Sequence, residues 1–156
     1  MKELNQSDKF HLRAAEGWLG LGDTVSASSE LENISPKFRA HPAVLLMRCQ
    51  IYQDEERLDA VIEVADTLVK KHPDIEAGWI LRSYALHEYR RTREAYDLLV
   101  PGADRFPNRT AFHYNLACYA CQLGQLQEAM QRLQRAIEVS GKKKEIILDA
   151  VNEPDL

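Results

Sequence analysis

The sequence has few of the features that mark enzymes and nucleic-acid-binding proteins. No glycine-rich phosphate loop and no Gly-x-Ser-x-Gly turn occurs. The net charge of −4 gives no broad basic surface that could neutralise phosphates, so nucleic acid is not expected as a partner. The three cysteines are an odd number, which suits a reducing compartment better than a disulfide framework. We therefore expect no catalytic residues, no metal and no cofactor.

Long apolar runs are also missing. Residues 1–12 lack the apolar core of a signal peptide, and no uncharged apolar run approaches the roughly 20 residues that a membrane span needs. We therefore expect a cytoplasmic protein. The 45% apolar and 28% charged residues are ordinary for a soluble globular protein, and 156 residues predict a single domain, 1–156.

The most informative feature is a period of 34 residues that occurs four times. Small residues recur at two positions of each unit, in the series Ala15, Cys49, Ser83, Ala117 and the series Ala27, Val61, Ala95, Ala129. Large residues follow the same spacing at Trp18, Tyr52 and Leu86. A fixed period of this length is typical of a solenoid, in which each unit buries its apolar face against its neighbours.

Each unit contains two helical patterns that are separated by a short polar break. The first helices are predicted at 8–21, 42–55, 75–89 and 109–123, and the second helices at 24–35, 58–71, 93–105 and 126–139. The breaks are short, so the two helices of a unit pair antiparallel. The predicted N-caps are Thr24 and Thr92 for second helices, and Asp74 and Asn108 for first helices. Pro36 predicts a break, and Pro101 a kink or break.

The segment 142–152 starts a fifth period that has no second helix. We expect it to cover the last helix pair as a terminal cap, because an exposed apolar end favours aggregation. Its first residues are Lys142, Lys143 and Lys144. These lysines could make weak contact with an anionic membrane surface. The alternative that we favour is that they complement the dipole of the preceding helix.

The repeat resembles the tetratricopeptide repeat in its length and in its residue types at fixed positions. The fourth unit carries the pattern best, with Leu116, Ala117, Gly124, Ala129, Leu133 and Ala136. The first unit departs from it, since Arg39 stands where the family has proline. The resemblance covers repeats at about 8–41, 42–75, 76–109 and 110–141. It implies an all-α fold, namely a right-handed superhelical α-solenoid of four helix-turn-helix units with a C-terminal capping helix.

The same resemblance implies a concave groove, lined by the first helices, that binds a protein or peptide segment. The groove residues that it implies are Leu12, Arg13, Leu46, Met47, Gln50, Ile80, Leu81, Tyr84, His87, Tyr114, Asn115 and Cys118. This lining is mostly apolar, which suits an amphipathic helix or an extended apolar segment rather than a clamp for carboxylates. The open alternative is that some of these side chains pack beneath the first helices.

The pair Cys118 and Cys121 has the spacing of a redox or zinc motif. It is predicted in the middle of a helix, with no second pair, so we interpret both cysteines as packing or groove residues. The function expected is therefore a non-catalytic adaptor or scaffold. A general similarity to bacterial kinesin light chains makes a bacterial tubulin-like filament one candidate partner. The alternative function is a chaperone or assembly factor for an apolar client segment.

Overall fold

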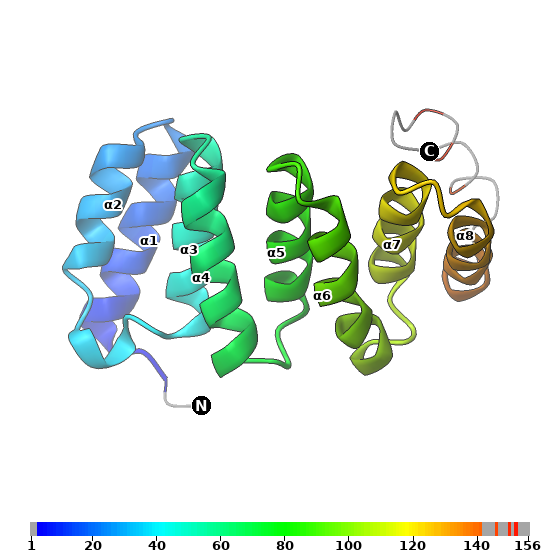
Figure 1. Cartoon of the computed structure of the whole chain (residues 1–156). Helices are drawn as coiled ribbons and strands as arrows, with labels where there is room; N and C mark the ends of the chain where they lie inside the picture. Colours follow the sequence, from blue (N-terminus) through cyan, green and yellow to red (C-terminus); the bar gives the residue numbers. More distant parts are fainter. Residues whose placement is uncertain (1–2, 142–145, 147–149, 151, 153–156) are drawn as a thin grey trace. The chain divides into compact units, whose positions relative to one another are not determined.

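The computed structural model describes residues 3–141 together with residues 146, 150 and 152 (Figure 1). Over these residues the chain forms eight α-helices, one short 3-10 helix and no strand, so the predicted all-α class is confirmed. The predicted membrane contact at Lys142, Lys143 and Lys144 lies outside the described residues. So does most of the predicted cap at 142–152, of which Ile146 is described and is buried.

The chain divides into two compact units, 1–81 and 82–156, and the boundary falls within α5. The first unit contains α1 (Gln6–Gly20), α2 (Thr24–Glu32), the 3-10 helix η1 (Pro36–Phe38), α3 (Pro42–Asp54), α4 (Leu58–Lys71) and the beginning of α5 (Glu76–Glu88). The second contains the remainder of α5, α6 (Thr92–Arg105), α7 (Thr110–Gln122) and α8 (Leu126–Ser140). The predicted helices agree with these bounds to within three residues.

The small residues of the 34-residue period form the core of each unit. All eight members of the two series are at most 5% exposed, so a short side chain at these places lets the helices of a pair approach closely. The pairs α1 with α2, α3 with α4, and α7 with α8 pack against each other. The large series is less uniform, because Leu86 is buried while Trp18 is 40% exposed.

The first helices of the four repeats end in the same backbone conformation. One residue after each helix has a positive φ: Gly22, Glu56, Arg90 and Gly124, which stand 34 positions apart. The next residue donates its N–H to the carbonyl five positions earlier, as in Asp23 to Trp18 (3.0 Å), Arg57 to Tyr52 (2.8 Å), Arg91 to Leu86 (2.9 Å) and Gln125 to Ala120 (2.8 Å). This is the Schellman motif, which satisfies the last carbonyls of a helix. The sequence period is therefore also a period of the backbone.

The helix N-caps differ from those that the sequence predicts. Asp23 caps α2 by accepting from the N–H of Ser26 (2.9 Å), while Thr24 is the first helical residue. The cap positions of α6 and α7 are Arg91 and Arg109, and neither makes a side-chain capping bond, so the predictions for Thr92 and Asn108 are wrong. The reason at α6 is that the helix already begins at Thr92. The prediction for Asp74 stays a prediction.

The two prolines act differently. The predicted break at Pro36 is confirmed, since α2 ends at Glu32 and only the short η1 follows. At Pro101 no break occurs, because α6 continues through the proline to Arg105. Pro101 is exposed, and the carbonyl of Leu98 in the preceding turn accepts a hydrogen bond from Arg82 Nη2 (3.0 Å). A charged donor at this turn offsets part of the hydrogen bonding that proline removes.

Candidate functional site

The second unit contains a cavity of about 510 Å³ that α5, α7 and the turn between α5 and α6 enclose. Its size lies in the range of roughly 300–1,000 Å³ that ligand-binding pockets occupy. The lining residues are Tyr84, His87, Glu88, Arg90, Thr92, Tyr114, Asn115, Cys118, Tyr119 and Gln122. Both first helices of this unit thus contribute side chains to one concave surface.

The floor of the cavity is held by a chain of contacts between buried and half-buried side chains. The rings of His87 and Tyr119 lie with their centroids 4.9 Å apart at 37°. Tyr119 is buried, and its hydroxyl donates to Ser83 Oγ at 3.3 Å. His87 Nδ1 lies 3.0 Å from Thr92 Oγ1, at the start of α6. These contacts fix the two rings before any partner arrives, which lowers the entropy that binding costs.

The rim of the cavity carries more mobile chemistry. Tyr84 is 45% exposed, and Tyr114 and Asn115 are half-buried. Arg90 is exposed and is placed at the rim by its left-handed backbone (φ 63°). Among the residues that the structure describes, no carboxylate forms an ion pair with Arg90. The rim therefore offers an aromatic face, an amide and a cation.

The thiols of the chain do not form a chemical centre. Cys118 and Cys121 lie within α7 as free cysteines, and Cys118 lines the cavity. Burial raises the pKa of the Cys49 thiol to about 12, which leaves it protonated and unreactive at neutral pH. Across the described part of the chain, no three His, Cys, Asp or Glu side chains gather into a group that could hold a metal ion.

The structure gathers one half of the predicted groove residues. Those of the second unit, Tyr84, His87, Tyr114, Asn115 and Cys118, all line the cavity. The others belong to the first unit: Leu12, Arg13, Leu46, Met47, Gln50, Ile80 and Leu81. Leu12 and Met47 are partly buried against the core, while Arg13 and Gln50 are exposed. A groove that runs through all four repeats stays a prediction.

Five lining residues were not predicted from the sequence: Glu88, Arg90, Thr92, Tyr119 and Gln122. They make the cavity more polar than the apolar lining that the first helices suggested. Arg90 and Thr92 lie at the turn, which a search limited to helix faces does not include. Their signal was the alignment of Arg90 with Gly22, Glu56 and Gly124, which marks a turn that meets the end of the first helix.

Two helix pairs of 34-residue spacing, closed by Schellman turns, define an α-solenoid of the tetratricopeptide-repeat type. Solved structures agree. MamA from Desulfovibrio magneticus RS-1 has a TM-score of 0.77 and 14% identity over 92% of this chain and 81% of that one. A thermophilic TPR protein of Thermus thermophilus has a TM-score of 0.67 and 19% identity over 92% of this chain and 82% of that one. The fold is therefore that of the tetratricopeptide-repeat solenoid proteins.

The amino-acid sequence itself matches no protein-family model and no curated protein. In the described residues, no helix combines the length and the apolar character that crossing a membrane requires.

Proposed function

We propose that this chain is a non-catalytic protein-interaction module and that the cavity of its second unit binds a segment of a partner protein. The observation that carries the proposal is the joint lining of one cavity by Tyr84, Tyr114 and Asn115, which come from the first helices of two successive repeats. Aromatic side chains that stay partly exposed beside a preformed cavity are the usual anchors of protein interfaces.

Each part of the cavity suits one part of a bound segment. Tyr84 and Tyr114 offer ring faces for an apolar side chain, at a low cost in side-chain entropy. The amides of Asn115 and Gln122 can pair with main-chain N–H and C=O groups of an extended segment. Arg90 favours a carboxylate or a main-chain carbonyl at the rim. The floor of His87 and Tyr119 excludes water beneath these contacts.

The role of such a module is that of an adaptor or scaffold. A bacterial tubulin-like filament is the candidate partner that the sequence resemblance suggests, and an anionic membrane is a second candidate surface. The alternative is a chaperone or assembly factor that holds an apolar segment of a client. The two roles differ in the state of the captured protein, which is folded and assembled for an adaptor but unfolded for a chaperone.

Affinity purification of the full chain from cells, with mass spectrometry of the captured proteins, tests the proposal. We expect Tyr84→Ala and Asn115→Ala to lose the specific partner. Tyr89→Ala is the matched control, because Tyr89 is similarly exposed (52% against 45% for Tyr84) but does not line the cavity. Circular dichroism checks that every variant folds. Retention of all partners by the double variant Tyr84→Ala/Asn115→Ala contradicts the proposal.

A further inference from the structure

The first unit contains a second cavity, of about 350 Å³, that belongs to none of the predicted sites. It lies between η1, the loop before α3 and the C-terminal end of α4. Its lining residues are Lys37, Phe38, Ala40, His41, Pro42, Lys71 and His72. Phe38 and Pro42 are buried and form an apolar floor. The two lysines are exposed, so their ammonium groups stand at the rim.

The histidines hold the wall of this cavity through hydrogen bonds that fix their protons. His72 Nε2 lies 2.9 Å from the carbonyl oxygen of Ala40, which can only accept, so Nε2 carries the hydrogen. His41 Nδ1 accepts the N–H of Ala43 (3.3 Å), so the neutral ring carries its hydrogen on Nε2. The cavity is therefore lined by a positively charged pair of lysines and by two imidazole rings that donate.

The charges in this cavity lack a counter-charge. No lining residue is acidic. Within the described part of the chain, neither Lys37 nor Lys71 pairs with a carboxylate, whereas the neighbouring Lys70 pairs with Asp66. Lys37 lies over the ring of Phe38 instead, 4.9 Å from its centroid. Burial, and next the charge of His72, lower the pKa of His41, as expected where positive charge gathers without an anion. An apolar floor with a cationic rim is complementary to an apolar group flanked by carboxylates.

We propose that this cavity binds an acidic segment of a partner protein, with one apolar side chain on Phe38 and flanking carboxylates on Lys37 and Lys71. The chain as a whole carries a net charge of −4 and repels acidic partners elsewhere, so a local cationic rim selects where such a segment docks. The site is separate from the cavity of the second unit. Each of the two proposals can therefore fail while the other holds.

Isothermal titration of the full chain with a capped peptide tests the proposal. The probe carries one phenylalanine flanked on each side by glutamates. We expect saturable binding that weakens about tenfold in the double variant Lys37→Gln/Lys71→Gln, since each exposed pair contributes up to about 1 kcal/mol. A peptide with alanine in place of phenylalanine is expected to bind about tenfold more weakly, because the floor then stays unfilled.

The controls separate this site from diffuse charge and from the other cavity. Lys70→Gln is the match for Lys71→Gln, because it removes the same charge one position away and should leave peptide binding unchanged. Tyr84→Ala should leave it unchanged as well. The proposal is overturned by absence of saturable binding, by equal binding in the double lysine variant, or by equal loss in Lys70→Gln. Equal affinity for the alanine peptide, or lysine-dependent binding of anionic vesicles instead of the peptide, also overturns it.

Discussion

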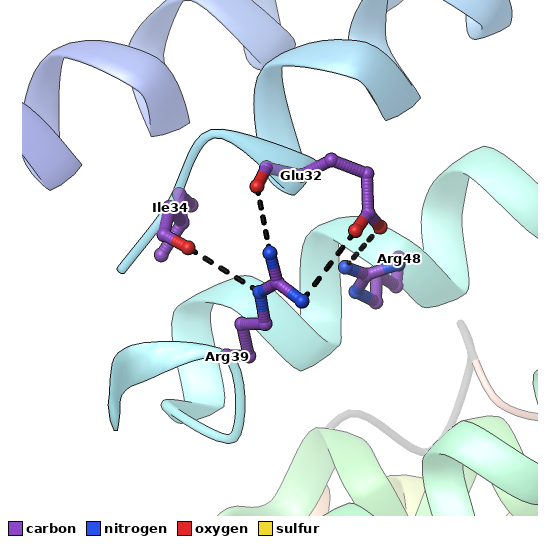
Figure 2. A network of polar contacts seen from close by, with 4 residues as sticks. All are labelled: Glu32, Ile34, Arg39 and Arg48. Carbon is purple, nitrogen blue, oxygen red and sulfur yellow. Dashed lines mark hydrogen bonds and ion pairs between the residues drawn. The ribbon is translucent and has the colours of Figure 1, made fainter. Parts of the chain in front are cut away.

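Arg39 Nη2 donates a hydrogen bond of 2.9 Å to the main-chain oxygen of Glu32, and this bond closes the end of α2 (Figure 2). The same guanidinium donates through Nε to the carbonyl of Ile34 (3.3 Å). Arg48 Nη2 pairs with the carboxylate of Glu32 at 2.8 Å. Pro36 stops the helix early and leaves carbonyls without partners, so Arg39 replaces the hydrogen bonds that a further turn would supply. This explains an arginine where the repeat pattern has proline.

Substitution of Arg39 by methionine should therefore destabilise the first unit. Methionine keeps most of the apolar stem but donates no hydrogen bond, and the expected loss is about 1 kcal/mol because the guanidinium is partly exposed. Glu32→Gln is the control, since it removes the carboxylate charge and keeps the main-chain oxygen, and it should cost less. Urea unfolding followed by circular dichroism measures both. Equal losses in the two variants would show that the side-chain ion pairs, not the carbonyl contacts, stabilise this turn.

Two of the four Schellman turns carry residues that are strained in a left-handed conformation. Glu56 has φ 55°, where an L-residue with a Cβ is disfavoured by about 1 kcal/mol relative to glycine. Glu56→Gly should therefore raise the midpoint of urea unfolding, although the greater freedom of glycine in the unfolded chain reduces the gain.

The converse change, Gly124→Ala, should lower the midpoint. A Cβ on Gly124 would meet no atom within 4 Å, so the cost would come from the backbone alone. Gly17→Ala is the matched control with equally open space, but it lies inside α1, where alanine should stabilise by about 0.5–1 kcal/mol. A loss in both alanine variants would contradict the conformational explanation.

The sequence predicts the helices and the core well because both depend on local patterns. The series of Ala15 and Ala27 has the spacing of helix packing, and every member of both series is buried. The turns are harder to predict. Glycine marks the left-handed position at Gly22 and Gly124, but Glu56 and Arg90 hold the same conformation without that signal, and only their place in the period reveals it.

The candidate site shows a similar limit. Tyr84, Tyr114 and Asn115 could be predicted, because they lie on helix faces that the repeat fixes. Arg90 could not be predicted from a helix face, since the α5–α6 turn brings it to the rim. The lysine-rimmed cavity of the first unit depends on where η1 places Lys37 and Phe38 beside the end of α4, and Pro36 disturbs the period at this point.

The three thiols should differ in reactivity because their burial differs. Cys49 is fully buried with a raised pKa, so a disulfide reagent at pH 8 should modify it only after the first unit opens. Cys121 is half-buried and should react first. Mass spectrometry after timed labelling assigns each site. Cys118 lines the second-unit cavity, so saturation with the captured partner should slow its modification. Fast labelling of Cys49 in the folded chain would contradict its placement in the core.

The contact between Tyr96 and Glu128 should make the second unit sensitive to acid. Tyr96 on α6 donates to Glu128 Oε1 at 2.6 Å, and Arg132 Nε lies 2.7 Å from the same oxygen. The bond from Tyr96, and next that from Arg132, lower the pKa of Glu128 below its ordinary value. A carboxylate with a lowered folded-state pKa stabilises the protein above its unfolded-state pKa, and this stabilisation is lost as the pH falls through the folded-state pKa.

Glu128→Gln should therefore be less stable than the unmodified chain at pH 7, by less than about 1 kcal/mol because the pair is partly exposed. The difference should shrink towards pH 3, where Glu128 becomes protonated. Tyr96→Phe should change stability in the same direction. Glu138→Gln is the control, since Glu138 pairs with Arg135 on α8 alone and receives no bond from α6. Urea titrations at pH 7, 5 and 3 measure the difference, and a Glu128→Gln deficit that is equal at all three values would refute the link between this carboxylate and the acid response.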